Sequence, residues 1–399
     1  MIVAVLVGIG FLFLNSSTME TERARLMQRQ LKTLWVTIPA LLVFSLLPMR
    51  FLARTAFTFY LIVLILLGVV LAAGVELNHA RRWMALPGGF TLQPSELCKP
   101  ALILALARYL EFRDAPERGR DLVGPILLTL VPFYLVYAEP DLGTALTYLP
   151  VAAAMLWVAR ARKLFFVTGL VLLLVLVPVM WFTPLLHDYQ KERIATYLTS
   201  IPSLEAKAKE AKSAGAIDRA RDLAQQAREL RRGRGSQAYS ALVAVGSGGV
   251  LGKGLGQGPQ NRLDYLPERH GDFVFAVIAE EWGFRGGTLV VVLYLLLMGS
   301  LLAIALASKD HFGRLVATGV ATCITTQAWI NIGVTTGLLP TKGLPLPLIS
   351  HGGSSMLSSL ILIGLAISVA RDGNRGDPFL YPAPRPQDPF CLKEAQTRL

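Results

Sequence analysis

The sequence predicts an all-α polytopic membrane protein with about ten transmembrane helices and one large extracytoplasmic loop. Hydrophobic residues make up 53% of the 399 residues, whereas charged residues make up only 17%. The hydrophobic residues fall in long runs, and no soluble core of this size could bury so many of them. The stretch from residue 183 to residue 271 has no membrane-length apolar run, which predicts the large loop.

The apolar segments follow one another along the chain, mostly with short loops between them. They lie near residues 1–14, 31–48, 57–74, 97–110, 122–138, 141–159, 164–182, 286–307, 313–338 and 352–370. The first would be only about 21 Å long as a helix, against a hydrocarbon core of about 30 Å. It lacks the basic start and the small-residue cleavage site of a signal peptide. We therefore expect a first transmembrane helix whose beginning is missing from this chain.

Basic residues in the short loops predict the orientation of the chain. They are Arg50, Arg54, Arg113, Arg118, Arg120, Arg160, Arg162, Lys163, Lys309 and Arg314, with Arg371 and Arg375 in the tail. With both termini in the cytoplasm, all of these lie inside, in agreement with the positive-inside rule. Arg23, Arg25 and Arg29 would lie outside and disagree, but they are the minority.

The chain has a net charge of +12, and many of its basic residues lie in these short loops. A charge of this size could indicate a nucleic-acid partner, but its distribution between apolar segments favours anionic membrane lipids. The three cysteines, Cys98, Cys323 and Cys391, are widely spaced and suggest neither a disulfide framework nor a metal cluster. We expect contact with membrane lipids and none with nucleic acid.

The chain divides into four expected regions. Residues 1–182 contain the first seven spans, 183–271 the extracytoplasmic loop, 272–370 a re-entering helix and the last three spans, and 371–399 a proline-rich cytoplasmic tail. Within the loop, residues 203–232 predict one or two exposed charged helices with a break at Gly215. This insertion could be a docking surface, but a solvated insertion on which little else depends is favoured.

A glycine-dense stretch from Gly246 to Gly258 precedes a group of charged residues and an apolar run. The charged residues are Glu268, Arg269, His270 and Asp272. Asp272 could simply cap the helix that follows, because a helix N-terminus favours an acid. Charge beside a membrane-depth helix is costly, however, so Asp272 is also a candidate catalytic residue. The glycines lack the Gly-Lys-Ser/Thr ending of a P-loop and the setting of a dinucleotide-binding fingerprint.

Two further polar groups lie on the same expected side of the membrane. Glu96 and Lys99 are spaced i, i+3 at the start of the fourth span, so they share a helix face and can pair. Ser95 or Glu96 could merely cap that helix, but an acid and a base inside a span require a polar cavity. Asp141 begins the sixth span, where capping and a functional role are equally well supported.

The last polar group runs from Leu338 to Ser355. Its prolines forbid a continuous helix, and irregular backbone at membrane depth needs protein or a watery cavity around it. Gln327 and Asn331 precede it at i, i+4, and interhelical hydrogen bonds are expected to satisfy them. The motifs of zinc and serine hydrolases do not occur, so hydrolytic chemistry has no support.

Taken together, these motifs resemble the SEDS family (shape, elongation, division and sporulation), the RodA, FtsW and SpoVE proteins of bacterial cell-wall synthesis. The matching motifs are Ala80-Arg-Arg-Trp83, Gln93-Pro-Ser-Glu-x-x-Lys99, Pro140-Asp-Leu-Gly-Thr-Ala145, Gly246-Ser-Gly-Gly249, Leu266-Pro-Glu-x-His-x-Asp-Phe273, Ala279-Glu-Glu281, Asn331-Ile-Gly333, and Gly337-Leu-Leu-Pro340 through Gly352-Gly-Ser-Ser355. They occur in family order over nearly the whole chain. Gly252-Lys-Gly254 resembles the RodA elongation branch and Leu339-Pro-Thr-Lys-Gly-Leu344 the FtsW division branch, and the RodA branch is favoured. Gly271, His351 and the insertion 201–235 depart from the family pattern.

The resemblance implies a peptidoglycan glycosyltransferase that acts in cell elongation and shape maintenance. Such enzymes polymerise lipid II, a disaccharide-pentapeptide on undecaprenyl pyrophosphate, at the outer face of the bacterial cytoplasmic membrane. By motif position Asp272 is the expected general base. The residues expected to contact substrate or diphosphate are Glu96, Lys99, Gln190, Arg193, Arg269 and His270, with Asp141, Lys342 and Ser354 in support. Glu96 is expected to hold Lys99 in place, and a divalent cation, Mg²⁺ or Mn²⁺, could also stabilise the leaving diphosphate.

The resemblance also implies a partner, a class B penicillin-binding protein that crosslinks the strands, together with other cell-wall elongation proteins. Gly319, Ala321 and Thr322 could let the partner's single helix approach closely, although packing inside the bundle explains them as well. A lipid II flippase or transporter is the main alternative, because ten spans and intramembrane charges suit that function too. An inert scaffold would not explain why Glu96, Lys99 and Asp272 share one side.

Overall fold

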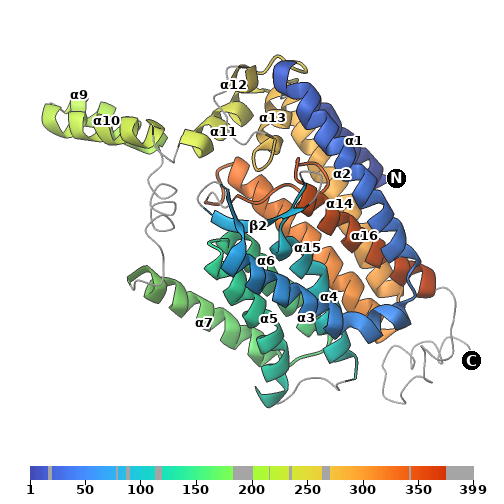
Figure 1. Ribbon diagram of the computed structural model, residues 1–399. Helices are drawn as coiled ribbons and strands as arrows, with labels where there is room; N and C mark the ends of the chain where they lie inside the picture. Colours follow the sequence, from blue (N-terminus) through green and yellow to red (C-terminus); the bar gives the residue numbers. More distant parts are fainter. Residues whose placement is uncertain are drawn as a thin grey trace, which may run out of the picture.

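The computed structural model describes residues 1–16, 20–77, 80–86, 90–112, 119–182, 201–214, 216–232, 236–262, 270–340 and 343–373. It is a bundle of helices with a small antiparallel sheet near one end (Figure 1). The expected proline-rich tail lies outside the described residues beyond Gly373.

Each of the ten apolar segments predicted from the sequence falls on a helix. The helices are α1 (Ile2–Ser16), α2 (Glu20–Leu46), α3 (Met49–Ala73), α4 (Pro94–Glu111), α5 (Gly119–Ala138), α6 (Leu142–Val158), α7 (Lys163–Phe182), α14 (Gly283–Ala307), α15 (His311–Thr335) and α16 (Gly353–Gly373). Within the described residues, five of these, α3, α5, α14, α15 and α16, are long and apolar enough to cross a membrane. The chain is therefore a helical polytopic membrane protein, while the count of ten spans stays a prediction.

Helices α4 and α15 form the centre of the bundle. Nearly every residue of α4 is buried, and α15 packs on α4, α6, α14 and α16. The outer helices instead expose large apolar side chains, such as Trp35 on α2, Ile62 on α3 and Leu296 on α14. Such an outward apolar face is what a lipid environment stabilises.

Gly319 lies at the buried centre and not on an outer face. A Cβ at this position would lie 2.8 Å from Ile103 and 3.0 Å from Met155. Packing inside the bundle, the alternative that the sequence favoured for these small residues, is therefore confirmed for Gly319, which lets α15 approach α4 and α6 closely, and Ala321 is buried as well.

A small sheet, not expected from the sequence, connects α3 to α4. Strands β1 (Val75–Leu77), β2 (Ala80–Leu86) and β3 (Phe90–Leu92) pair antiparallel in the order β1-β2-β3. Val75 pairs with Trp83, and Met84 pairs with Leu92. The sheet satisfies the backbone of a polar connection that the Pro87-Gly88-Gly89 sequence prevents from being helical.

The glycine-dense stretch wraps around the end of a short buried helix, α13 (Val274–Glu281). It follows α11 (Ser236–Ser247) and leads to α12 (Pro259–Arg262). The amides of Lys253 and Gly254 donate to the carbonyls of Glu280 (3.1 Å) and Glu281 (2.9 Å), which satisfies the end of α13. Gly252 has φ +79°, and a Cβ there would lie 2.1 Å from the Glu281 carbonyl oxygen. These glycines therefore serve close backbone packing.

The charged insertion forms two helices, α9 (Ile201–Ser213) and α10 (Ile217–Arg232), on either side of Gly215 as predicted. They pack on each other and project from the bundle in Figure 1. The two helices are not polar on every face. Leu204 is buried against Leu223 and Tyr239, which gives the α9–α10 hairpin its own small apolar contact.

Candidate active site

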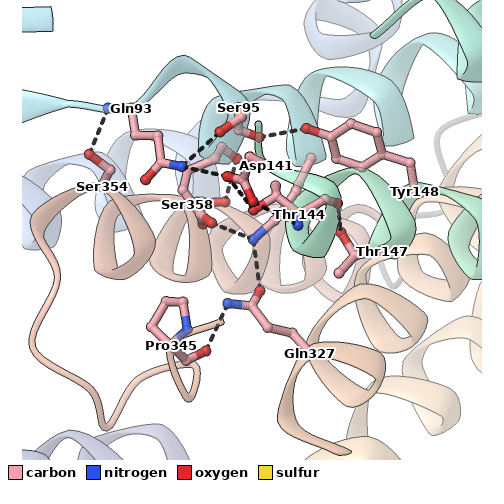
Figure 2. Close-up of polar contacts among 12 residues, drawn as sticks. Gln93, Ser95, Asp141, Thr144, Thr147, Tyr148, Gln327, Pro345, Ser354 and Ser358 are labelled. Atoms are coloured by element: carbon pink, nitrogen blue, oxygen red, sulfur yellow. Dashed lines mark hydrogen bonds and ion pairs between the residues drawn. The ribbon is translucent and has the colours of Figure 1, made fainter. Parts of the chain in front are cut away.

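The polar groups singled out in the sequence meet at one end of the bundle, where the sheet, α13 and the loop 343–352 lie (Figures 1 and 2). Hydrogen bonds link the start of α4 to α6, α15 and α16, and Gln327 on α15 bonds in turn to this loop. Residues far apart in the sequence thus form one buried polar cluster.

Glu96 and Lys99 form the predicted ion pair. Lys99 Nζ lies 2.7 Å from Glu96 Oε1 and donates a second hydrogen bond, 2.8 Å long, to Gln327 Oε1 on α15. Each of the two charged residues is only 2% exposed. A buried pair of this kind is compensated only while both partners are present.

Gln93 joins three elements just before α4. Its side-chain amide donates to Asp141 Oδ2 and to Ser95 Oγ, each at 3.0 Å, and its backbone amide donates to Ser354 Oγ at 2.9 Å. Asp141 caps α6 as predicted, by accepting from the Thr144 amide at 3.2 Å. The alternative in which Ser95 or Glu96 caps α4 does not hold, because Gln93 is the N-cap residue and Pro94 follows it.

Ser358 satisfies a backbone group that a proline leaves open. Pro100 has no N–H, so it cannot donate to the Glu96 carbonyl four residues earlier. Ser358 Oγ on α16 donates to this carbonyl instead, at 2.8 Å. Tyr148 OH on α6 donates to the neighbouring Ser95 carbonyl, also at 2.8 Å. The sequence analysis did not identify Ser358 or Tyr148. Pro100 inside an apolar segment does indicate that the Glu96 carbonyl needs a donor such as Ser358.

The irregular loop 343–352 is satisfied by side chains from α14 and α15. Asn331 Nδ2 donates to the Leu344 carbonyl at 2.6 Å. Gln327 Nε2 donates to the Pro345 carbonyl at 3.0 Å, as Figure 2 shows. Tyr294 OH donates to the Pro347 carbonyl. The interhelical hydrogen bond expected for Gln327 is confirmed, because its Oε1 accepts from Lys99 on α4. For Asn331 the described partners are instead the backbone carbonyls of Leu344 and Asp272.

Asp272 lies two residues before α13 and is half-buried. The capping alternative was wrong, because the N-cap residue of α13 is Phe273, without a side-chain cap bond. Asn331 Nδ2 donates to the backbone carbonyl of Asp272 at 2.7 Å. The loop 343–352 passes beside the Asp272 carboxylate, since a Cβ on Gly343 would lie 3.2 Å from Oδ2. The neighbouring His270 is also half-buried, and its carbonyl accepts from the His351 amide at 2.8 Å.

Four of the expected site residues, Gln190, Arg193, Arg269 and Lys342, lie outside the described residues. Their proposed contacts with diphosphate stay predictions. Among the residues that are described, no group of three or more His, Cys, Asp or Glu side chains could hold a metal ion. The described side chains therefore do not fit a preformed divalent-cation site.

Glu139 is a buried acid next to this cluster that the sequence did not single out. It is 1% exposed, and neither carboxylate oxygen has a hydrogen-bond partner among the described residues. Burial, and then the nearby charge of Asp141, raise its pKa to about 8, while Arg82 acts in the opposite direction. Arg82 Nε donates to the Glu139 carbonyl at 2.9 Å, and Arg82 Nη1 lies 4.0 Å from Asp141 Oδ1. The loop between α5 and α6 thus holds an acid that is protonated near neutral pH.

The FTSW_RODA_SPOVE family profile, described as "Cell cycle protein", matches residues 1–375. The chain belongs to this family. It is 32% identical to peptidoglycan glycosyltransferase MrdB of Escherichia coli (strain K12) over 344 residues, which cover 86% of this chain and 85% of the relative. It is 36% identical to the probable peptidoglycan glycosyltransferase FtsW of Geobacter sp. (strain M18) over 315 residues, or 78% and 76% of the two chains. Stage V sporulation protein E of Bacillus subtilis (strain 168) is 35% identical over 316 residues, again 78% and 76%.

Solved structures of similar chains support the fold. A chain from a structure described as "Structural coordination of polymerization and crosslinking by a peptidoglycan synthase complex" matches with a TM-score of 0.74 and 33% identity. That match covers 93% of this chain and 96% of the other. The rod shape determining protein RodA of Thermus thermophilus matches with a TM-score of 0.65 and 31% identity, over 93% and 95% of the two chains.

Proposed function

We propose that this chain is a peptidoglycan glycosyltransferase that polymerises lipid II into glycan strands. Support comes from the family match over residues 1–375 and from relatives that are named as peptidoglycan glycosyltransferases. The observation that carries the proposal is the setting of Asp272. This half-buried carboxylate belongs to the buried polar end of a membrane-embedded bundle, with its backbone bonded to α15.

In the proposed reaction, a sugar hydroxyl of the acceptor attacks the anomeric carbon of the donor. The new glycosidic C–O bond forms as the bond between that carbon and the diphosphate oxygen breaks, and the hydroxyl proton passes to the Asp272 carboxylate. The diphosphate leaves with the bonding electron pair. Partial burial suits Asp272 for this role, because the carboxylate remains reachable while part of its surrounding water is excluded.

Lys99 would stabilise the negative charge that builds up on the leaving diphosphate. Its Nζ donates two of its three hydrogens to Glu96 and Gln327, so a phosphate oxygen could accept the third if it reached this buried group. Arg269, Gln190 and Arg193 remain the proposed direct contacts. Asp141 and Ser354 act in support, because both position Gln93 at the entry of the helix that carries Lys99.

We place the site on the outer face of the bacterial cytoplasmic membrane, with both termini in the cytoplasm. The basic short loops support this orientation. Of the two branches we favour the elongation type, in view of the Gly252-Lys-Gly254 motif and the similarity to MrdB and RodA. The FtsW and SpoVE relatives have comparable identity, so division is the alternative role.

We also propose a class B penicillin-binding protein as the partner, in keeping with the matched chain from a peptidoglycan synthase complex. A membrane enzyme that releases a glycan strand needs a crosslinker within reach, and association raises the effective concentration of the second enzyme. Co-expression should give a detergent-stable one-to-one complex that polymerises faster than this chain alone. Failure to co-purify in several detergents, with polymerisation unchanged by the partner, would count against a stable complex.

The proposal is tested by lipid II polymerisation with purified wild-type protein and with Asp272→Asn. Asn keeps the size of the side chain but is not a base, so the variant should fold and lose glycan synthesis. Thr322→Val, which removes a partly buried hydroxyl from α15 far from Asp272 in sequence, is the control and should retain activity. Near-normal glycan synthesis by Asp272→Asn would remove Asp272 from the catalytic role.

A further inference from the structure

The backbone of the segment that carries Asp272 is held by a row of hydrogen bonds. Three consecutive carbonyls, those of His270, Gly271 and Asp272, each accept from a different donor. The donors are the His351 amide at 2.8 Å, Ser350 Oγ at 2.5 Å and Asn331 Nδ2 at 2.7 Å. All three donors come from α15 or from the loop 343–352, about 60 to 80 residues further along the chain.

This arrangement matters because His270–Asp272 lies in a turn before α13 and not in a helix. The carbonyls of a turn are not fixed by a regular backbone ladder, so other groups must fix them. Donors on a buried helix and on a loop that is itself held at several points supply that constraint here. The backbone of Asp272 therefore takes its position from the C-terminal part of the chain.

Asn331 is the junction of this arrangement. Its side-chain amide group has two hydrogens, and both are used, one on the Asp272 carbonyl and one on the Leu344 carbonyl at 2.6 Å. Asn331 is 2% exposed and lies on the central helix α15. It thus ties the turn of Asp272 and the loop beside the Asp272 carboxylate to the same rigid element.

Ser350 adds a second tie between the same two segments. Its hydroxyl donates to the Gly271 carbonyl and accepts from the Leu346 amide at 2.8 Å, so it bridges the turn and the loop. The loop also restricts the space open to the Asp272 side chain, because a Cβ on Gly343 would lie 3.2 Å from Asp272 Oδ2. The hydrogen bonds given above for Asn331 and Ser350 all join them to backbone groups and not to the Asp272 carboxylate. Both residues therefore act on Asp272 through its backbone.

We infer that Asn331, with Ser350, is a positioning residue for Asp272, which sets the catalytic carboxylate by fixing the backbone on which it stands. This inference rests on the proposed role of Asp272 as the general base. A catalytic group displaced by about 1 Å can lose as much as about a hundredfold in rate, so the ties should matter for turnover. They should matter little for substrate affinity, because neither residue supplies the diphosphate contacts.

The test uses the full-length protein in detergent and compares Asn331→Leu and Ser350→Ala with a matched control, Thr335→Val. Thr335 lies one turn further along α15 and is fully buried, and its hydroxyl donates to the backbone carbonyls of Asn331 (3.0 Å) and Ile332 (2.9 Å) of the same helix, so its replacement leaves the Asn331 side chain in place. The measurements are kcat and KM for lipid II polymerisation, thermal unfolding, and hydrogen exchange of the peptide that contains residues 270–273.

Asn331→Leu should lower kcat by about tenfold or more with KM within about twofold of wild type, and residues 270–273 should exchange faster. Ser350→Ala should show the same pattern with a smaller loss, and Thr335→Val should change neither kcat nor the exchange of this peptide. Full turnover by folded Asn331→Leu, or a rise in KM at unchanged kcat, would overturn the inference. If Asn331→Leu does not fold, Ser350→Ala decides by the same criteria.

These outcomes are distinct from failure of the proposed function. A wild-type protein without polymerising activity, or an active Asp272→Asn variant, would remove the proposed function itself. An inactive Asp272→Asn variant together with a fully active Asn331→Leu variant would remove only the positioning role.

Discussion

The two most polar regions of this molecule, the site end of the bundle and the α9–α10 hairpin, use their charges in opposite ways. At the site end, Glu96, Lys99 and Asp141 are buried and bonded to defined partners. On the hairpin, Lys207, Lys209 and other charged side chains are exposed, and the apolar contact is limited to Leu204, Leu223 and Tyr239. A buried charge is costly unless it is paired, whereas an exposed one contributes little in either direction. Charge density alone therefore does not indicate where function lies.

The largest expected effect comes from breaking the ion pair at the site end. Glu96→Gln or Lys99→Met alone should destabilise the protein by about 3–5 kcal/mol, because each leaves one buried charge without its partner. The double variant should lose less than the sum of the two single losses. Thermal unfolding in detergent and lipid II polymerisation would measure the coupling. Strictly additive losses would show that the two residues do not act as a pair.

Because of Glu139, the free energy of unfolding should decrease as the pH rises. The folded state holds its proton more tightly than the unfolded chain does, since the pKa rises from the ordinary 4.5 to about 8. This contribution to stability is fully present below about pH 4.5 and is lost as the pH rises toward about 8. Gln does not titrate, so Glu139→Gln should lack this loss, and its free energy of unfolding should rise relative to that of wild type by about 4 kcal/mol between pH 5 and pH 8.5. A constant difference in unfolding temperature between variant and wild type across this range would contradict the raised pKa.

Gly343→Ala tests, within the site end of the bundle, whether the loop 343–352 constrains the Asp272 carboxylate. Gly343 has φ +65°, and the added Cβ would lie 3.2 Å from Asp272 Oδ2. An alanine in this left-handed backbone conformation should lower the free energy of unfolding by about 1–2 kcal/mol. Crowding of the Asp272 carboxylate by the added Cβ should separately lower the polymerisation rate. Gly8→Ala on α1, where no atom lies within 4 Å of the added Cβ, is the control and should be neutral or slightly stabilising. Wild-type turnover by Gly343→Ala would show that the loop does not constrain Asp272.

The smallest effect is expected from removing the hairpin. Deletion of residues 203–232 with a short Gly-Ser bridge should leave lipid II polymerisation largely intact in detergent. Helices α9 and α10 pack chiefly on each other, and their small apolar contact reaches the rest of the chain through Tyr239. Loss of activity in the isolated, folded deletion variant would place the insertion in the active site.

The sequence predicted those features of the site that depend on neighbouring residues. The i, i+3 pairing of Glu96 with Lys99 and the capping of α6 by Asp141 are both confirmed, because helix geometry alone brings these groups together. The capping role of Asp272 was not confirmed, since α13 begins one residue later than the acid pattern suggested. Helix boundaries are set by local backbone choices that residue type only weakly determines.

Features that depend on distant segments could not be predicted in the same way. The interhelical bond expected for Gln327 is present, to Lys99 on α4, but the bonds of Gln327 and Asn331 to the loop carbonyls of Pro345 and Leu344, and of Asn331 to the backbone of Asp272, were not expected. For Gly319 the sequence only slightly favoured packing in the bundle over contact with a partner helix, and the arrangement of α4, α6 and α15 decides for the bundle. Tertiary packing sets these contacts, and no periodicity within one segment encodes them.

The measurement that tests the central claim most directly uses proteoliposomes that contain this protein alone, with lipid II on one face only. We predict glycan polymer from lipid II on the outer face without a second enzyme, and none with Asp272→Asn. Movement of lipid II across the membrane without polymer would contradict the account and would identify the protein as a lipid transporter.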